Sequence, residues 1–476
     1  MIQRQLHRSP RLAVVLAVLV LFAPSARAGI HGWVGPSSGG LWSNGANWDT
    51  GVPTSGEMGG TIVAFASNVV STQNIAGLVV DRIVFFGSGN TIHGSTPLGL
   101  RSTVITNNIS DSSGGNTLAS DLGVVLDGTA ANPVQVNVAG GTLTLAANLS
   151  GAAGDISIAG NVALNGVNGY TGTVTVKSGV VTLNSSSTAI TEDVTVGDNV
   201  GAANSATLRE MSNSNIANGA NVYVGSDGRF DLNGFDEVIA GLGGVAGSGG
   251  SVTLGATSLL QLDLTGGSYR SFPGIITGAG SVTIGGDGSR IQYFYGNNTY
   301  SGPTVVNGGG ILSIDGSQAA SHVTVNGGIL LGAGTMGNTD AMSGSVNPGL
   351  LYGGSSALHA GTVSLASGFS VNVGTGLNPP NDSLAATGPI TLGNSTLVLQ
   401  VGASLNDGDV FTILTTPSSL TGTFAGLPNN DSVVAPGGKE FRVNYTPTAA
   451  TLTYCATTAP TVTAPGAATI TQSVCQ

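Results

Sequence analysis

The sequence predicts an all-β protein with the architecture of a β-solenoid, in which short parallel strands stack rung upon rung. Apolar and polar residues alternate over three to five positions and are then interrupted by Gly or Asn, as in residues 134–138, 155–158 and 173–176. Period-two alternation is typical of short strands with one buried face. The Gly-Gly, Asn-Gly and Asp-Gly separators supply the positive φ angles that turns require.

Length decides among the all-β folds. The alternating pattern continues for roughly 390 residues without a Pro-rich linker or a charged run, whereas a single core stops growing near 250–300 residues. A solenoid escapes this limit because each rung buries its side chains only against the neighbouring rungs. We therefore expect a single elongated domain, with rungs stacked at the strand spacing of about 4.8 Å.

Composition excludes several other classes of protein. Of the 476 residues, 77 are Gly and only 8% are charged, and Lys occurs only at Lys177 and Lys439. The chain therefore lacks the basic clusters of nucleic-acid-binding proteins and the Ala/Glu/Lys/Leu periodicity of coiled coils. Collagen is excluded because the glycines keep no three-residue period.

The first 28 residues are predicted to form a signal peptide. A basic stretch (residues 4–11) precedes an apolar run (residues 12–23), and Ala26-Arg27-Ala28 matches a cleavage site. The run is shorter than the ~20 residues that a spanning helix needs. We expect cleavage after Ala28 and no transmembrane segment in the mature chain; an uncleaved anchor is the alternative. The mature chain then carries nine basic and 24 acidic residues, a net charge of −15.

Three tryptophans, Trp33, Trp42 and Trp48, stand near the amino-terminal end. A solenoid must cover its open core there, so we interpret them as part of a cap; a ligand platform is the alternative. The expected organisation after the signal peptide is a cap over residues 29–60, repeats over 61–452 and a Cys-bounded tail over 453–476.

Internal repeats support the solenoid. Residues 168–176 (Asn-Gly-Tyr-Thr-Gly-Thr-Val-Thr-Val) align with residues 298–306 (Asn-Thr-Tyr-Ser-Gly-Pro-Thr-Val-Val), and a Gly and a second apolar strand follow each. This unit resembles the autotransporter-associated β-strand repeat. Other stretches match such proteins in the same order: the W-x-x-x-x-N-W segment of residues 42–48 with Pro53, and residues 326–337, 344–349, 382–384, 408–414 and 422–428.

The resemblance covers roughly residues 33–454. It implies a bacterial passenger-type secreted domain folded as a right-handed parallel β-helix. Autotransporters continue into a membrane barrel of amphipathic strands, whereas this sequence stops at Gln476, about 20 residues after the repeat pattern. We therefore expect either separate export machinery or that the chain is the front of a longer protein.

No catalytic or metal-binding pattern stands out, and no cofactor is expected. The mature histidines are far apart without metal-ligand spacing: His31, His93, His322 and His359. The rival hypothesis is a β-helical polysaccharide lyase or hydrolase whose acid/base groups would come from Asp81-Arg82, Asp231 and Asp263. Nothing in the sequence brings these residues together.

Aromatic residues provide the candidate ligand-binding site. Tyr293, Tyr295 and Tyr300 gather in a chain that is only 5% aromatic, and sugars and surfaces often stack on aromatic rings. A ladder of rings inside the solenoid is the alternative interpretation. Together these observations favour a secreted or cell-surface structural or adhesive scaffold, non-catalytic, with a glycan or a surface as ligand.

Cys455 and Cys475, the only two cysteines, are predicted to form a disulfide that ties the tail to the last rung. An exported chain meets an oxidising compartment, and a loop of this length gains about 3 kcal/mol from closure. Thiol titration of the denatured, exported protein checks the bond, and we expect no reactive thiol. Two reactive thiols per chain would contradict the prediction.

Overall fold

The computed structural model describes residues 28–152, 154–266, 269–349, 356–376, 381–403 and 405–456. These residues divide into two compact units. Unit 1 runs to Ile239 and includes residues 244–252, and unit 2 holds residues 240–243 and the chain from Thr253 onward. The sequence pattern shows no boundary at this point. The described residues form no helix long and apolar enough to cross a membrane.

The described residues are almost entirely strands and turns, and one 3-10 helix, η1 (Gly45–Asn47), accompanies them. The strands up to the unit boundary are β1 (Gly29–Gly32), β2 (Gly40–Leu41), β3 (Thr61–Phe65), β4 (Val70–Gln73), β5 (Val79–Val80), β6 (Arg82–Phe85), β7 (Thr91–Gly94), β8 (Leu98–Arg101), β9 (Ile109–Asp111), β10 (Asn116–Leu118), β11 (Gly123–Asp127), β12 (Val134–Leu145), β13 (Asn148–Gly151), β14 (Ile156–Leu164), β15 (Gly169–Tyr170), β16 (Val174–Leu183), β17 (Val194–Val196), β18 (Ala206–Glu210), β19 (Asn221–Val224), β20 (Gly228–Asp231), β21 (Glu237–Ile239), β22 (Gly241–Gly244) and β23 (Ser251–Leu254).

The following strands are β24 (Leu259–Leu264), β25 (Arg270–Phe272), β26 (Ile275–Gly278), β27 (Ser281–Gly286), β28 (Gln292–Phe294), β29 (Thr304–Asn307), β30 (Ile311–Ile314), β31 (Ser317–Gln318), β32 (Val323–Gly332), β33 (Thr335–Met336), β34 (Thr339–Pro348), β35 (Ala357–Ala360), β36 (Val363–Leu365), β37 (Gly368–Val373), β38 (Ser383–Ala386), β39 (Ile390–Gly393), β40 (Thr396–Val401), β41 (Val410–Thr415), β42 (Leu420–Thr423), β43 (Ser432–Val434), β44 (Glu440–Thr446) and β45 (Ala449–Cys455).

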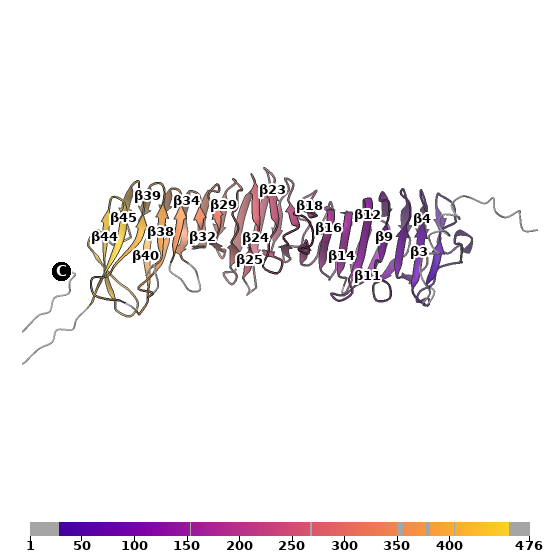
Figure 1. The fold of residues 1–476 in the computed structure, drawn as a ribbon, viewed down its shortest axis with the longest axis horizontal. Helices are drawn as coiled ribbons and strands as arrows, with labels where there is room; N and C mark the ends of the chain where they lie inside the picture. The colour runs from indigo at the N-terminus through magenta and orange to yellow at the C-terminus, as the bar shows by residue number, and fades with distance from the viewer. Residues whose placement is uncertain are drawn as a thin grey trace, which may run out of the picture. The chain divides into compact units, whose positions relative to one another are not determined.

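Unit 1 consists of three rows of parallel strands. The first row runs β1–β3–β6–β9–β12–β14–β16–β17–β19, the second β2–β4–β7–β10–β12–β14–β16–β18–β20, and the third β5–β8–β11–β13–β15. One strand from each row, for example β6, β7 and β8, makes one rung. The chain returns to the same row after 18 residues between Ile156 and Val174 and after 27 between Ile109 and Val136. The predicted all-β, parallel arrangement is confirmed (Figure 1), and it is consistent with a β-solenoid.

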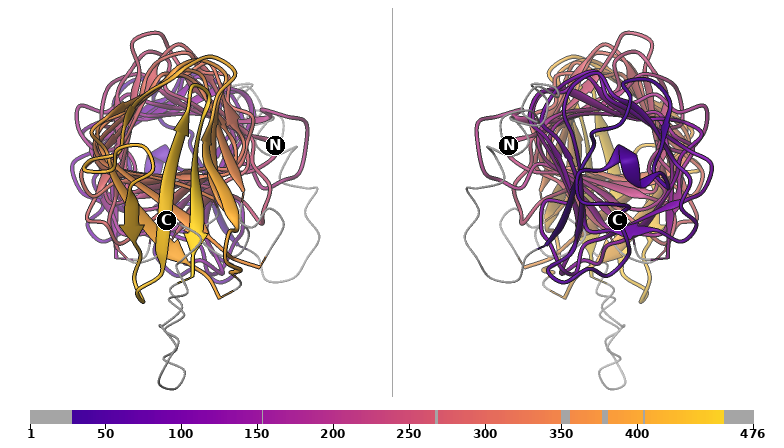
Figure 2. Two further views of the ribbon diagram at one scale, coloured as in Figure 1. Left: turned by 90° about the vertical axis from the view of Figure 1, so that its left-hand side faces the viewer. Right: turned by 90° about the vertical axis from the view of Figure 1, so that its right-hand side faces the viewer.

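Unit 2 repeats this arrangement and ends differently. Its parallel rows are β24–β27–β29–β32–β34–β36–β39–β42, β25–β28–β30–β32–β34–β37–β40 and β31–β33–β35–β38–β41. After them, β45 pairs antiparallel with β41 and β44, and β43 pairs antiparallel with β44. These antiparallel strands, yellow in the left view of Figure 2, replace the parallel repeats that the sequence predicts up to residue 452.

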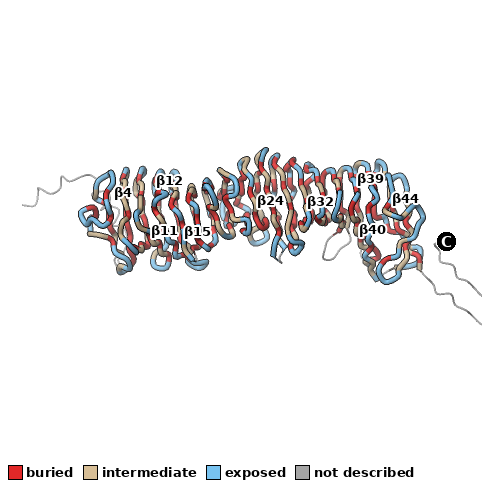
Figure 3. Tube along the Cα trace, turned by 180° about the vertical axis from the view of Figure 1, so that it is seen from behind, coloured by how far each residue is buried: buried red, intermediate tan, exposed pale blue. Residues whose placement is uncertain are grey.

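The core of each unit is made of inward-facing side chains stacked in register. Ile156, Val174 and Val194 occupy adjacent positions of one row and are at most 3% exposed. Along β16, Val174 and Val176 are buried while Thr175 between them is only partly buried, and a similar alternation of buried and more exposed positions runs along much of the chain (Figure 3). Because aliphatic residues occupy the same position on successive rungs, each aliphatic side chain is packed between two others. This burial of apolar surface drives the fold.

Glycine is required where β12, β14 and β16 bend from the first row into the second. Gly160 and Gly179 have φ angles of 110° and 80° there. A Cβ on Gly160 would lie 2.0 Å from the carbonyl oxygen of Val138, and one on Gly179 would lie 2.4 Å from the carbonyl carbon of Gly160. The corner therefore excludes a side chain because the backbones of successive rungs are in contact.

Buried asparagines pair with backbone groups that the turns leave unpaired. The Oδ1 atoms of Asn90, Asn168 and Asn298 accept hydrogen bonds from the backbone N–H groups of Val69, Leu149 and Ile276, at 3.0, 2.9 and 2.8 Å. In each case the donor belongs to a segment about 20 residues earlier in the chain. Because an unpaired buried N–H costs 1–3 kcal/mol, these amides stabilise the stacking of one rung on the next. The Asn residues between strands therefore form turns and also bond successive rungs to each other.

The carboxyl-terminal tail is described only as far as residue 456. Cys455 is the last residue of β45 and is buried. Cys475 lies outside the described residues, as do residues 1–27 of the expected signal peptide. The disulfide and the cleavage site therefore remain predictions from the sequence.

Substitution of the two faces of β16 provides a stability test. Val176 is fully buried and faces inward, whereas Thr175 lies between Ser157 and Thr195 on the outward side. We expect Val176→Asp to lower the free energy of unfolding by several kcal/mol because it buries an unpaired carboxylate. Thr175→Asp should cost about 0.5 kcal/mol. Denaturant melts of both variants and the parent measure the difference, and an equal loss would contradict the assigned faces.

Candidate functional site

The outward side of the second row in unit 2 carries the candidate site. In β28, Gln292 and Phe294 are fully buried and face the core, so Tyr293 between them points outward. Its neighbours in register are Ser271 on β25 and Ser313 on β30. Short side chains on both sides leave space for the large ring on this face.

Three tyrosines meet on this face, and we call Tyr269, Tyr293 and Tyr295 the tyrosine cluster. The Tyr293 and Tyr295 rings are stacked, with centroids 5.7 Å apart and an interplanar angle of 4°. Tyr269 meets Tyr293 edge-on at 5.8 Å and 89°. Tyr269 and Tyr295 are 66% and 49% exposed, whereas Tyr293 is only 8% exposed. Tyr293 therefore supports two rings that solvent and a ligand can reach.

A half-buried carboxylate, Asp315, lies beside the cluster. Its Oδ2 accepts a hydrogen bond from the Ser313 hydroxyl at 3.1 Å, and its Oδ1 accepts one from the Ala333 N–H at 3.3 Å. Burial raises the pKa of Asp315. Burial, followed by the charge of Asp315 and by Tyr269, raises the pKa of Tyr295. The site thus combines exposed aromatic faces, phenol hydroxyls and one carboxylate.

Tyr300 does not belong to this surface. Its ring is fully buried, and its hydroxyl is 2.5 Å from Thr304 Oγ1 and donates to Gln318 Oε1 at 3.3 Å. Burial raises the pKa of Tyr300 to about 12. Tyr170, at the matching position of the internal repeat, is also buried, and its hydroxyl donates to the Ala189 carbonyl oxygen at 3.2 Å. The alternative of an interior ring therefore holds for Tyr300, which shares this placement with Tyr170 of the internal repeat.

The amino-terminal tryptophans are interior side chains. Trp33, Trp42 and Trp48 are at most 4% exposed, and the Trp48 ring meets the other two edge-on at 5.0 and 5.4 Å. Each indole N–H donates within the chain, to Pro36 O, Ser71 Oγ and Trp42 O respectively. Viewed end-on, η1 lies over the interior of this part of unit 1 (Figure 2). The rings fill the first rung and leave no platform for a ligand.

The acidic residues considered for catalysis are held in separate places. Asp81 is fully buried and forms a bidentate ion pair with Arg101 at 2.8 and 2.9 Å. Asp231 pairs with Arg209 and Arg229 at 2.9 and 3.1 Å. Six strand-to-strand steps separate β6 from β20, roughly 30 Å at the usual strand spacing. Asp81 and Asp231 therefore cannot act on one bond, and Asp263 lies in unit 2 on the outward side of β24.

In the described part of the chain, no histidine belongs to a group of side chains that could bind a metal ion. His31, His93 and His322 each lie 3.0 Å from one carboxylate, of Glu57, Asp121 and Asp340 respectively. Within the described ranges, no three His, Cys, Asp or Glu side chains are placed so that they could hold a metal ion.

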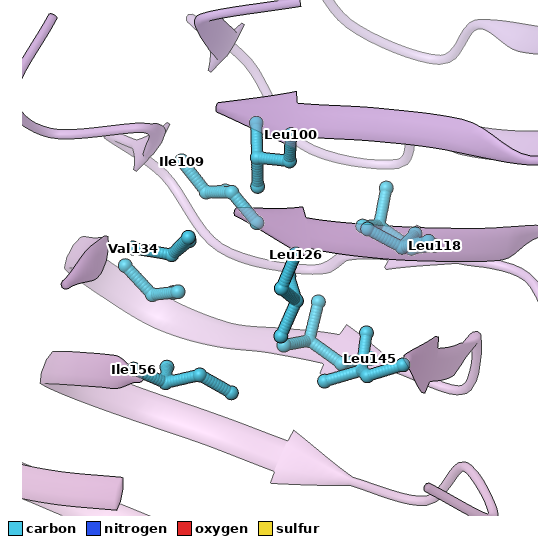
Figure 4. A pocket seen from close by; sticks show the side chains of 10 residues that line it. Leu100, Ile109, Leu118, Leu126, Val134, Leu145 and Ile156 are labelled. Atoms are coloured by element: carbon cyan, nitrogen blue, oxygen red, sulfur yellow. The ribbon is translucent and has the colours of Figure 1, made fainter. Parts of the chain in front are cut away.

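An apolar cavity of about 10 Å³ lies inside unit 1 (Figure 4). Ten aliphatic side chains line it: Leu100, Ile109, Leu118, Val124, Leu126, Val134, Val136, Leu145, Leu149 and Ile156. This volume is at the lower limit for one water molecule, which would find no polar partner there. The cavity is a packing defect of the core and is too small for a ligand.

Neither the protein-family models nor the curated proteins compared with this chain match it.

The different positions of Tyr300 and Tyr295 predict different effects on stability. Tyr300→Ala should lower the free energy of unfolding by about 3–5 kcal/mol, as for other large buried aromatic residues, whereas Tyr295→Ala should cost about 1 kcal/mol or less. Tyr300→Phe, which keeps the ring and loses the hydroxyl, should cost about 1 kcal/mol. Chemical denaturation measures all three variants. A larger loss for Tyr295→Ala than for Tyr300→Ala would contradict the placement.

Proposed function

We propose that this chain is a secreted or cell-surface adhesive scaffold, built as a right-handed parallel β-helix and without catalytic activity. The observation that carries the proposal is the tyrosine cluster, in which Tyr269 and Tyr295 expose their aromatic rings beside the supporting ring of Tyr293. Rigid aromatic rings give large contact area at low entropic cost, which is why Tyr is common in binding surfaces.

A glycan is the ligand that best fits this chemistry. A sugar ring presents a face of C–H groups that stacks on an aromatic ring, and its rim of hydroxyls can bond to phenol and carboxylate oxygens. The tyrosine cluster supplies two exposed rings at its edges, and Asp315 supplies the carboxylate. The low charge of the chain, 8% of its residues, disfavours a ligand held mainly by charge.

Features of the sequence and of the strand connections also support a secreted β-helix. The predicted signal peptide and the resemblance to autotransporter-associated repeats favour export to the cell surface. Connections between parallel strands of one sheet are right-handed in nearly all known folds, which favours a right-handed helix for both units. Parallel strands held by many hydrogen bonds between rungs make a rigid support for a projecting binding site.

Glycan binding by the mature chain tests the proposal. We expect it to bind a subset of glycans on a printed array, and the double variant Tyr269→Ala/Tyr295→Ala to lose at least tenfold in affinity because both stacking faces are gone. Met342→Ala is the matched control: Met342 is also in unit 2 and is 57% exposed, and it lies outside the cluster. The control should bind like the parent.

Two results would contradict the proposal. If the double variant binds as tightly as the parent, the tyrosine cluster is not the binding site. If the folded parent binds no glycan and adheres to no cell surface, the adhesive function itself is wrong. Circular dichroism of each variant shows whether the fold is retained.

A further inference from the structure

A carboxyl group interrupts a row of leucines inside unit 1. Leu145, Leu164 and Leu183 stack in register on β12, β14 and β16, and Glu210 on β18 takes the next position after Leu183. These leucines are at most 3% exposed, and Glu210 is fully buried. Neither side-chain oxygen of Glu210 has a hydrogen-bond partner by distance and angle. A buried ionised carboxylate without a partner is strongly disfavoured.

A second buried carboxyl, Glu237 on β21, lies beside Glu210 and interacts with it. Unlike Glu210, Glu237 is well partnered by the backbone. Its Oε2 accepts hydrogen bonds from the N–H groups of Asn215 and Ile216 at 2.9 and 3.2 Å, and its Oε1 accepts from Val238 at 3.0 Å. Three N–H donors favour a negative charge on Glu237, whereas the aliphatic surroundings favour a neutral Glu210.

No cation offsets this pair in the described part of unit 1. Glu210 on β18 lies between β16 and β20 and beside Glu237 of β21, and among the described residues Glu237 is the charged group whose field acts on it. The other charged residues of these segments lie on outward positions or in exposed turns: Lys177, Arg209, Arg229, Asp231 and Asp236. Burial, reinforced by the repulsion of Glu237, raises the pKa of Glu210, and burial also raises the pKa of Glu237.

We propose that Glu210 and Glu237 form a proton-sharing pair that makes unit 1 a pH-sensitive element, stable in acid and progressively weaker toward alkaline pH. The proton resides on Glu210, which has no N–H donor, and the negative charge resides on Glu237, which accepts three backbone hydrogen bonds. When this part of unit 1 opens, both carboxyls enter water and ionise, and the proton is released to solvent. No other co-reactant is needed.

The sign of the pH dependence follows from this proton release. Carboxyls of the unfolded chain ionise near pH 4.5, whereas the folded pair keeps at least one proton above that pH. The folded state therefore binds more protons, and its stability falls as pH rises from the unfolded pKa toward the folded one. For each proton that only the folded state retains, the equilibrium constant for folding falls about tenfold for each unit by which the pH rises in this range. Ordinary salt-bridged carboxylates have the opposite dependence.

Hydrogen exchange of the full mature chain measures this effect locally. In peptides covering residues 206–239, we expect protection, corrected for the intrinsic exchange rate, to fall about tenfold per unit between pH 6 and pH 8. Glu210→Gln keeps the shape of the side chain and has no proton to lose, so its protection should vary little with pH. Glu192→Gln is the matched control because Glu192 is exposed in the same unit, and it should behave like the parent.

A second measurement keeps the proposal testable if Glu210→Gln does not fold. The parent at pH 8 should show the infrared carbonyl band of a protonated carboxyl, and the band should remain in Glu192→Gln. The proposal is overturned if Glu210→Gln keeps the pH slope of the parent, or if the parent shows neither the slope nor the band. It is also overturned if calcium restores protection at pH 8 and a chelator removes it, because the pair would then hold a cation.

Discussion

Pairing of every strand with the next rung is the constraint on which the rest of this structure depends. A strand of a parallel stack has its hydrogen-bond partners about 20 residues away in sequence, so each turn must return the chain in register. Where the turn leaves a backbone N–H inside, an amide such as that of Asn90 or Asn168 accepts its hydrogen bond from the neighbouring segment. Where the chain bends between rows, glycine allows backbones to touch, as at Gly160.

The same stacking sets what the outer surface can present. Identical positions of successive rungs lie about 4.8 Å apart, so like charges in one row would repel each other. The outward rows are accordingly rich in Ser and Thr, and the few acids and bases lie next to each other in pairs such as Arg209 and Asp231. A large ring fits where its neighbours are small, as Tyr293 does between Ser271 and Ser313. The proposed binding surface therefore depends on register as much as on composition.

Inward rows tolerate a departure from aliphatic residues only where partners are available. Gln292 is fully buried, yet its amide pairs with the backbone of Leu242, accepting from the N–H at 3.1 Å and donating to the carbonyl oxygen at 2.8 Å. Tyr300 is buried with hydroxyl partners on Thr304 and Gln318. Glu210 departs from this rule, because its neighbour is another acid. Two buried acids side by side, unlike an amide or a phenol with neutral partners, make the stability of this region depend on pH.

The sequence by itself determined the all-β class, the parallel pairing of most strands and the buried face of regular strands such as β16, because these follow from local alternation and from length. It did not determine the antiparallel strands β43–β45. Val176 inside and Thr175 outside could be assigned from period two alone. The tertiary structure decided what meets across rungs. Tyr269 joins Tyr293, Tyr300 turns inward and Glu210 falls into a leucine row because loop lengths and hydrogen bonds between distant strands set the register. Local alternation carries no information about that register, since every rung repeats the same pattern.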